Sequence, residues 1–234
     1  MHKILVIIPA YNEQDSIINV IKKLKKDCPR ADYVVINDCS KDNTLSVLKE
    51  NNTSFVNLPI NLGIGGGVQT GYKYALENGY DIAIQIDGDG QHDTAYLDKV
   101  IAPIEEGVAD IAIGSRFIDK EGFQSSGMRR AGIKFLSALI KICCGTKVRD
   151  VTSGFRAVNR KYIKMYAYDY PTDYPEPEAI VQASVDGARI AEVPVIMKER
   201  ETGQSSIYAW KSIYYMIKVS LAIIICRISK RRKR

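Results

Sequence analysis

Short apolar runs alternate with amphipathic segments along the first half of the chain. Apolar runs bounded by polar turns predict strands, and apolar residues spaced three or four apart predict helices. This alternation is typical of an α/β fold in which helices flank a mostly parallel central sheet. The predicted strands are residues 4–8, 33–36, 54–58, 81–86 and 109–113, and the predicted helices are 15–26, 44–51, 94–106 and one that follows a glycine-rich turn and ends near residue 77.

Beyond residue 113 the pattern is looser. We expect residues 114–160 to form loops around one helix at 133–143. We expect residues 161–200 to form a short helix and a strand at 188–197. No linker rich in Pro, Gly or Ser divides the chain, so the sequence predicts one compact domain rather than two.

The chain begins with the apolar segment MHKILVIIP, which no small-residue cleavage site follows. We therefore interpret it as a strand and not as a signal peptide, and we expect the domain to stay in the cytoplasm. The 234 residues are 46% hydrophobic and 26% charged, which is ordinary for a globular protein. The five cysteines show no framework spacing, so we expect reduced thiols.

Positive charge is concentrated at the end of the chain. Lys and Arg number 33 against 27 Asp and Glu, and residues 227–234 carry six of the positive charges and no acidic residue. The remainder is formally neutral, which argues against a general nucleic-acid surface and for one localised contact, with RNA or with an anionic membrane leaflet. The sequence thus predicts a domain over residues 1–206 and a C-terminal amphipathic helix with a basic tail over residues 207–234.

The segment before the tail favours the membrane. Residues 207–228 contain Trp210, Tyr214, Tyr215 and an apolar run, but two lysines interrupt them. A spanning helix needs about 20 nearly uncharged residues, so this segment is too short and too charged to span a bilayer. It suits an interfacial helix, or one half of a helical pair completed by a membrane protein. The alternative is a helix packed on the domain's own core.

Polar clusters follow three of the predicted strands, after residues 8, 36 and 86. The carboxyl ends of parallel strands meet at one edge of a sheet, where such sheets bind ligands. Asp87 and Asp89, separated by one glycine, could share a hard divalent cation, and Gln91 could complete its shell. We expect His92 to support or pack against this turn. The alternative is an Asp-Gly turn without a special role.

The glycines of residues 61–67 do not match a dinucleotide-binding turn. The pattern G-x-G-x-x-G counted from Gly63 needs a glycine where Val68 stands, and no Gly-Lys-Ser/Thr follows. The segment also follows the third predicted strand and not the first. These features argue against a dehydrogenase and against a P-loop kinase. We expect the glycines to let the backbone approach a ligand or a neighbouring strand closely.

Seven polar segments occur in a distinctive order and spacing between residues 3 and 206. They are Pro9-Ala10-Tyr11-Asn12-Glu13, Asn37-Asp38 with Ser40 and Asp42, Asn61 with Gly63, Asp87-x-Asp89-x-Gln91-His92, Gly114-Ser115-Arg116, Thr152-Ser153-Gly154-Phe155-Arg156, and Glu192-Val193-Pro194 with Arg200, Gly203 and Ser205. In this order they resemble family 2 glycosyltransferases of the dolichyl- or polyprenyl-phosphate sugar synthase type. The resemblance implies a GT-A nucleotide-sugar fold, a Mg2+ or Mn2+ ion, and inverting transfer from a UDP- or GDP-sugar.

The resemblance also implies roles for single residues. Those that would line the nucleotide pocket are Pro9, Tyr11, Glu13, Asn61 and Gly63, with Asp38 on the base and Asp87 on the ribose or the metal. Asp89 and Gln91 would hold the metal on the diphosphate. The cations that would act on the reacting groups are Arg116 and one or both of Arg129 and Arg130, on the acceptor phosphate, and Arg200, over the diphosphate.

Two kinds of acceptor stay open. A polyprenyl phosphate is largely ionised near neutral pH because its second pKa is about 6, so it needs cations and no strong base. A hydroxyl of a lipid-linked oligosaccharide, capsule or O-antigen chain needs a carboxylate base, for which Glu176, Glu178 and Asp150 are candidates. We favour the first, a synthase of polyprenyl-phosphate-linked sugar for cell-envelope glycans. The non-enzymatic alternative is a nucleotide-sugar sensor or an inactive scaffold of a glycan assembly complex.

Three departures from the family pattern shape the expected partners. Asn37 stands where an acidic residue is usual, Ser206 stands where many relatives have lysine, and one hydrophobic helix stands where many relatives have two or more spanning helices. We therefore expect the protein at the cytoplasmic face of the membrane, held there by a small multi-helix membrane protein or by docking on anionic lipid. We expect a homo-oligomer in addition to that membrane protein or in its place. No nucleic-acid partner is expected.

Overall fold

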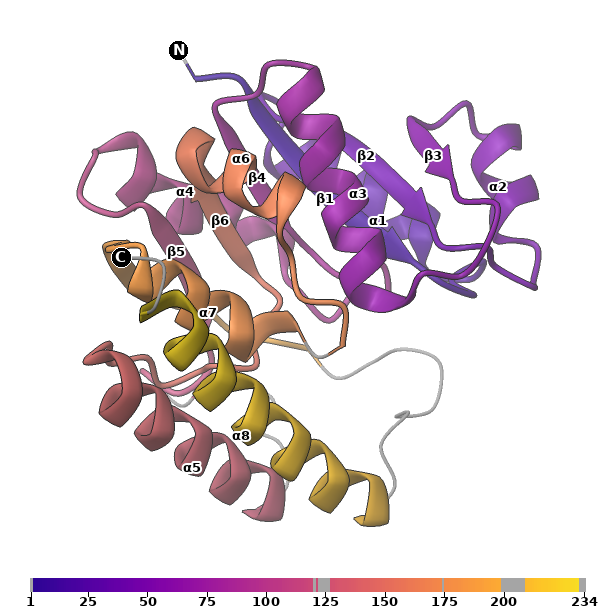
Figure 1. The fold of residues 1–234 in the computed structure, drawn as a ribbon. Helices are drawn as coiled ribbons and strands as arrows, with labels where there is room; N and C mark the ends of the chain where they lie inside the picture. The colour runs from indigo at the N-terminus through magenta and orange to yellow at the C-terminus, as the bar shows by residue number, and fades with distance from the viewer. Residues whose placement is uncertain (1, 120, 122–126, 174, 199–208, 232–234) are drawn as a thin grey trace.

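The computed structural model describes residues 2–119, 121, 127–173, 175–198 and 209–231. In these ranges seven strands form one sheet in the order β3-β2-β1-β4-β6-β5-β7 (Figure 1). The strands are β1 (Ile4–Ala10), β2 (Asp32–Asn37), β3 (Phe55–Asn57), β4 (Ile82–Gln85), β5 (Ile111–Ser115), β6 (Arg156–Asn159) and β7 (Ile190–Pro194). The helices are α1 (Ile17–Asp27), α2 (Thr44–Glu50), α3 (Gly63–Glu77), α4 (Leu97–Glu105), α5 (Gly127–Cys144), α6 (Arg160–Tyr168), α7 (Pro175–Val185) and α8 (Ala209–Arg231), with a short 3-10 helix at Thr94–Tyr96.

The sheet is parallel except at β6, which pairs antiparallel with both β4 and β5. Strand β1 lies near the middle and is buried along its whole length. Its alternate side chains feed two cores: Leu5 and Ile7 pack with α3, and Ile4, Val6 and Ile8 pack with α1 and α4. Burial on both faces explains why this strand is a continuous apolar run rather than an alternating one. The predicted α/β fold with a mostly parallel sheet is confirmed.

The prediction of loops over residues 114–160 is wrong at two places. Helix α5 begins at Gly127, earlier than the predicted start at 133, and residues 156–159 form β6. The short sequence RAVN does not look like a strand because it begins with an arginine. Arg156 is nevertheless only 1% exposed, because backbone carbonyls accept hydrogen bonds from its guanidinium. Between residues 161 and 185 the structure also has two helices, α6 and α7, where one was predicted.

The glycine-rich segment is helical and not a turn, because α3 begins at Gly63. Its glycines permit close packing on two sides. A Cβ atom at Gly65 would lie 2.2 Å from the Pro171 carbonyl oxygen, and one at Gly71 would lie 2.2 Å from Ile7 Cγ2 in β1. The close approach to a strand is thus made by Gly71, which lies outside the 61–67 segment, whereas within that segment Gly65 approaches the 171–172 backbone.

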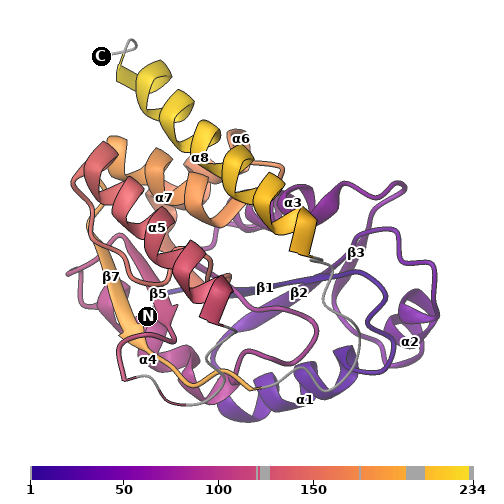
Figure 2. The same ribbon diagram turned by 90° about the horizontal axis from the view of Figure 1, so that it is seen from below.

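Helix α8 packs beside α5 and over α7 (Figures 1 and 2). Val219, Ile223 and Cys226 are buried and belong to the same core as the sheet face that α3 covers. This part of the helix therefore packs on the domain, as the alternative interpretation of the sequence expects. The boundary predicted at residue 206 and the side chains of Trp210, Tyr214 and Tyr215 lie outside the part of the chain that is described.

Across the described ranges, no helix combines the length and the apolar character that crossing a membrane requires.

Gly71→Ala tests the packing of α3 on β1. We expect it to lower the free energy of unfolding by about 1–3 kcal/mol, because the new methyl group must displace the Ile7 side chain. The matched control is Gly67→Ala in the same helix, where the nearest atom to a new Cβ, Pro9 Cβ, is 3.8 Å away. That variant should be neutral or more stable by up to about 1 kcal/mol, because alanine favours helix. Chemical denaturation measures both, and equal effects would contradict the packing argument.

Candidate active site

The carboxyl ends of β1, β2 and β4 bring the predicted nucleotide residues to one edge of the sheet. Gly88, in the turn after β4, lies against the end of β1: a Cβ atom there would be 3.1 Å from the Pro9 carbonyl oxygen and 3.5 Å from Glu13 Cγ. The loop after β1 is joined to the loop after β2, because the Asn12 N–H donates to Ser40 Oγ and the Glu13 N–H donates to Thr44 Oγ1. Tyr11 is 42% exposed at this edge.

Asp38, Asn61 and Gly63 form one hydrogen-bonded group. The Leu62 N–H donates to Asp38 Oδ1 at 2.7 Å, and Asn61 Nδ2 donates to the Asp38 carbonyl oxygen at 3.0 Å. Asn61 Oδ1 in turn accepts from the Gly63 N–H. Asp38 is only 5% exposed. Its hydrogen bonds with Asn61 and Leu62 tie the end of β2 to the start of α3. The structure thus brings these three predicted residues together.

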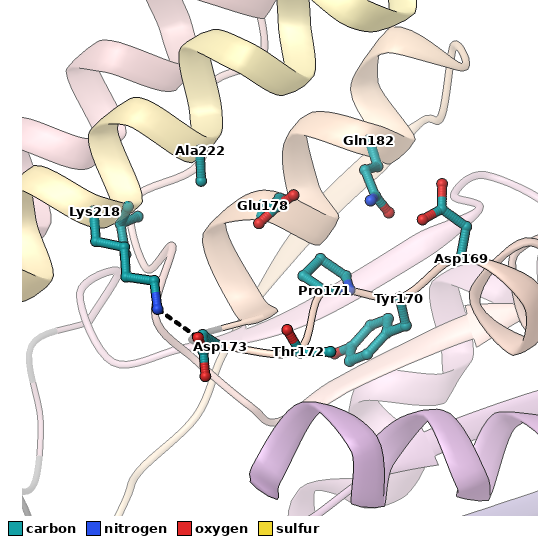
Figure 3. A pocket seen from close by; sticks show the side chains of 10 residues that line it. Asp169, Tyr170, Pro171, Thr172, Asp173, Glu178, Gln182, Lys218 and Ala222 are labelled. Carbon is teal, nitrogen blue, oxygen red and sulfur yellow. Dashed lines mark hydrogen bonds and ion pairs between the residues drawn. The ribbon is translucent and has the colours of Figure 1, made fainter. Parts of the chain in front are cut away.

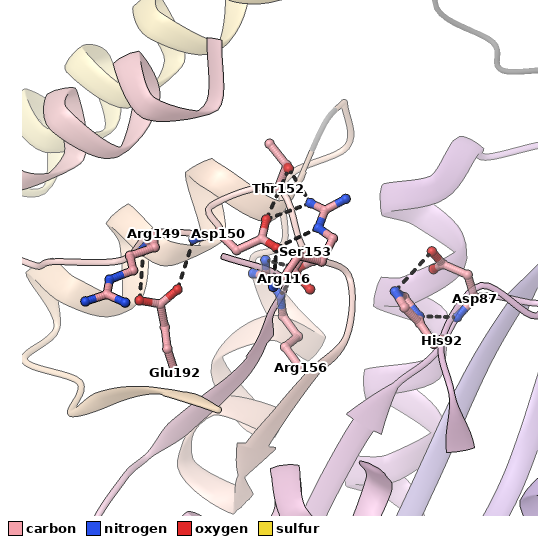
Figure 4. A network of polar contacts seen from close by, with 9 residues as sticks. All are labelled: Asp87, His92, Arg116, Arg149, Asp150, Thr152, Ser153, Arg156 and Glu192. Carbon is pink, nitrogen blue, oxygen red and sulfur yellow. Dashed lines mark hydrogen bonds and ion pairs between the residues drawn. The ribbon is translucent and has the colours of Figure 1, made fainter. Parts of the chain in front are cut away.

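The turn after β4 holds two carboxylates of different exposure. The side chain of Asp87 is 37% exposed, whereas Asp89 is 7% exposed and accepts from the Gln91 N–H at 3.0 Å. His92 supports the turn, because its Nδ1 accepts from the Asp87 N–H at 3.0 Å (Figure 4). Its ring also stacks on Phe155. His92 therefore anchors the turn, as the sequence led us to expect.

The residues of this turn fit a hard divalent cation. In the described part of the chain no three His, Cys, Asp or Glu side chains gather around one point. Mg2+ and Mn2+ need no such group, since one or two carboxylates together with substrate phosphates commonly hold them. Beside Asp87, the amide of Gln85 is buried, and neither of its polar atoms has a partner among the described residues. The side-chain oxygens of Asp87, Asp89 and Gln91 are the donors available here, and the Gln85 amide without a described partner adds a further polar group. Oxygen donors match this class of metal.

Arg116, at the end of β5, is held by a buried carboxylate. Its Nε and Nη2 donate to the two oxygens of Asp150, both at 2.7 Å, and Nη2 also donates to Thr152 Oγ1 at 3.1 Å (Figure 4). Asp150 is completely buried, and the backbone N–H groups of Arg149 and Asp150 donate to Glu192 of β7. A buried carboxylate that already binds an arginine is unsuited to act as a base on an acceptor hydroxyl. The predicted contact of Arg116 with an acceptor phosphate stays a prediction.

Arg156 is a second buried cation, and the sequence did not single it out as a site residue. Its Nη2 donates to the Ser153 carbonyl oxygen at 2.7 Å, and its Nη1 donates to the Glu176 carbonyl oxygen at 3.1 Å. It therefore fixes the segment before β6 to the start of α7. The available signal was its place in the Thr152–Arg156 motif. For Gln85, also missed, the signal was a polar residue inside the apolar run of β4.

Glu176 and Glu178 point to different places although only two residues separate them. Burial raises the pKa of Glu176, and the positive charge of Arg156 partly opposes that rise; Asp87 and Arg129 are also close enough to influence this pKa. Glu176 therefore lies within electrostatic range of both the carboxylate turn and the start of α5. Glu178 instead lines a separate pocket of about 280 Å³ between α7 and α8, with Gln182 and Lys218 (Figure 3).

Arg129 and Arg130 are exposed in the first turn of α5. The partial positive charge of a helix N-terminus repels cations and attracts anions. Binding of an anionic ligand beside these two arginines would therefore reduce the repulsion. Arg200 lies outside the described residues.

Comparison with known proteins identifies the family and the fold of the chain. The profile of glycosyl transferase family 2 matches residues 5–166. An undecaprenyl-phosphate mannosyltransferase of Micrococcus luteus is 28% identical, over 87% of this chain and 86% of the relative. A UDP-N-acetylglucosamine–dolichyl-phosphate N-acetylglucosaminyltransferase of Methanococcus voltae is 33% identical, over 82% of this chain and 84% of the relative. Glucosyl-3-phosphoglycerate synthase of Mycobacterium tuberculosis, solved with Mn2+, UDP and phosphoglyceric acid, has the same fold, with a TM-score of 0.73, 18% identity and coverage of 97% of this chain and 78% of that one.

Asp150→Asn tests the buried ion pair. We expect it to lower the free energy of unfolding by about 3–5 kcal/mol, because it leaves the Arg116 charge buried without a counter-ion. The control is Asp173→Asn, which breaks the exposed pair of Asp173 with Lys218 and should cost no more than about 1 kcal/mol. Chemical denaturation measures both variants. Similar small losses would mean that the buried pair contributes no more than a surface one.

Proposed function

The chain belongs to glycosyl transferase family 2 and is a glycosyltransferase, and we propose that it moves a monosaccharide from a UDP- or GDP-sugar to a polyprenyl phosphate such as undecaprenyl phosphate, with inversion, for cell-envelope glycan synthesis. One observation carries this proposal. The charges of both Asp87, in the carboxylate turn, and Arg129, at the start of α5, reach Glu176 strongly enough to influence its pKa. A place for a metal-bound diphosphate and a place for an acceptor anion therefore adjoin one another. The names of the relatives, which include polyprenyl-phosphate transferases for different sugars, support the acceptor class and leave the sugar open.

On the donor side, the loops after β1 and β2 would hold the nucleotide. Pro9, Tyr11, Glu13, Asn61 and Gly63 would line its pocket, and Asp38 would contact the base through the oxygen that does not accept from Leu62. Asp87, Asp89 and Gln91 would hold Mg2+ or Mn2+. When bound, this ion would neutralise the diphosphate leaving group.

On the acceptor side, the problem is to bring a phosphate close to a diphosphate. Arg129 and Arg130 are exposed and would bind the acceptor phosphate, and a guanidinium fork suits that role. Asp150 already binds the guanidinium of Arg116, so Arg116 would contact the acceptor phosphate only by sharing that group between the two anions. We therefore propose that Arg116 chiefly positions the 149–153 segment. Arg200 would close over the diphosphate. The phosphate is ionised near neutral pH, so its oxygen can attack the anomeric carbon without a base.

We propose that the protein works at the cytoplasmic face of the membrane, because its acceptor would be embedded there. A small multi-helix membrane partner and a homo-oligomer stay predictions.

The first experiment is transfer of labelled sugar from a panel of UDP- and GDP-sugars to undecaprenyl phosphate, with and without Mg2+ or Mn2+. We expect a metal-dependent lipid product, reduced at least about 100-fold by Asp89→Asn and also reduced by Arg129→Ala with Arg130→Ala. Absence of a lipid product with every donor would overturn the proposal.

One observation favours a second candidate, transfer to a hydroxyl of a lipid-linked oligosaccharide or polysaccharide. The raised pKa of Glu176 suits a general base, and the charges of Asp87 and Arg129 at the candidate site reach this residue. Glu176→Gln distinguishes the two. It should change transfer to a phosphate by less than about 3-fold, and it should reduce transfer to a hydroxyl by about 100-fold or more. Glu178→Gln, in the same helix but facing the other pocket, is the matched control and should leave either activity unchanged.

A further inference from the structure

Helix α8 exposes an apolar face where a helix on a globular protein is normally polar. Among residues 216–228, the exposed positions are all isoleucine or leucine: Ile217 (57% exposed), Leu221 (53%), Ile224 (40%), Ile225 (62%) and Ile228 (53%). Val219, Ile223 and Cys226 on the opposite side are buried in the core. The usual amphipathic pattern buries one apolar face and shows polar residues to water. This helix is apolar on both faces.

Helix α5 repeats this arrangement. Phe135 is 54% exposed and Ile142 is 81% exposed, and their spacing of seven residues places them on one side of the helix. Lys134 and Lys141, one residue before each, are exposed beside them. The buried residues of α5 are Ile133, Leu136 and Ile140, which belong to the same core as those of α8.

The two helices lie side by side and run in the same direction (Figures 1 and 2). Near the start of α5, a Cβ atom at Gly132 would be 3.1 Å from Met216 Sδ of α8. Near the ends of the two helices, burial raises the pKa of Cys144, and Arg227 of α8 is close enough to oppose that rise. Both helices pack on α7. Their exposed apolar residues therefore point away from the domain on the same side. We call these seven residues the α5/α8 face: Phe135, Ile142, Ile217, Leu221, Ile224, Ile225 and Ile228.

The sequence around this face carries only positive charge. Residues 122–149 contain six Lys or Arg and no Asp or Glu, and residues 207–234 contain eight Lys or Arg and no Asp or Glu. The rest of the chain holds all the acidic residues. An apolar centre surrounded by cations is the composition of a surface that lies in the interface of an anionic bilayer.

We propose that the α5/α8 face inserts into the surface of an anionic bilayer with both helices in the membrane plane, which deepens the proposed function and rests on it for the acceptor. A second copy of the chain fits this face poorly, because pairing would bring two strongly basic segments together. A nucleic acid fits poorly because isoleucine and leucine neither stack on bases as aromatic rings do nor hydrogen-bond to phosphate. Docking in this way brings Arg129 and Arg130, at the start of α5, to the bilayer surface, where the phosphate of a membrane-embedded polyprenyl chain lies.

The test is co-sedimentation of the full chain with vesicles of phosphatidylcholine, with and without phosphatidylglycerol. We expect binding that needs phosphatidylglycerol and weakens with salt. Ile142→Asp with Ile225→Asp should weaken it at least about 10-fold, because each substitution removes an apolar side chain that the bilayer would bury and adds a charge that the lipid repels. The matched control is Val108→Asp, an equally exposed apolar position (60%) in the loop between α4 and β5, which should bind as the wild type does. Thermal unfolding must show that the variants remain folded.

A second measurement separates this inference from the proposed function. The Ile142→Asp, Ile225→Asp variant should keep the wild-type turnover on a short, water-soluble prenyl phosphate and lose turnover on undecaprenyl phosphate embedded in vesicles. Vesicle binding without transfer to any prenyl phosphate would overturn the proposed function and support the membrane face. Failure of the wild type to bind protein-free vesicles, unchanged binding by the double variant, or a stable dimer that buries this face would overturn the inference.

Discussion

The buried pair of Arg116 with Asp150 organises the part of the candidate site that would receive the acceptor. Neither charge is tolerable in the core alone, so the segment after α5 must lie against the end of β5. Glu192 of β7 holds the same segment from the other side through two backbone N–H groups. From this segment the chain enters β6, the antiparallel strand between β4 and β5, with Arg156 directed to the start of α7. The position of α7, and with it Glu176, therefore depends on two buried arginines and the oxygens that bind them.

The donor half is built differently, from backbone and short side chains. The loops after β1 and β2 are joined by hydrogen bonds from backbone N–H groups to side-chain oxygens, and the glycines of α3 let that helix approach β1 and the 171–172 backbone. His92 and Phe155 hold the carboxylate turn after β4 from beneath. An edge fixed by these contacts would suit binding of a nucleotide and its metal, because preorganised groups lower the cost of binding.

The two halves carry opposite charge for a physical reason. In the proposed reaction, sugar transfer between a diphosphate and a phosphate needs cations on both anions, and the carboxylates would recruit a metal on one side while the arginines would act on the other. The proposed docking of the α5/α8 face on a bilayer fits this arrangement, because a lipid-linked acceptor is reached only from the bilayer surface. Helices α5 and α8, which are basic and apolar and lie next to Arg129 and Arg130, would hold the enzyme on the bilayer surface. Enzyme and acceptor would then meet within the plane of the bilayer.

The local pattern of the sequence was sufficient for the first five strands, their helices and the polar clusters at the strand ends, because each depends on periodicity or on short motifs within one segment. The order of the motifs was sufficient for the family. Tertiary structure alone decided four features: that RAVN is a strand, that Arg116 binds Asp150, that Glu176 and Glu178 diverge, and that α8 buries one apolar face and exposes another. Each depends on contacts between segments far apart in the chain, which supply the partners for a buried charge or decide which side of a helix meets the core.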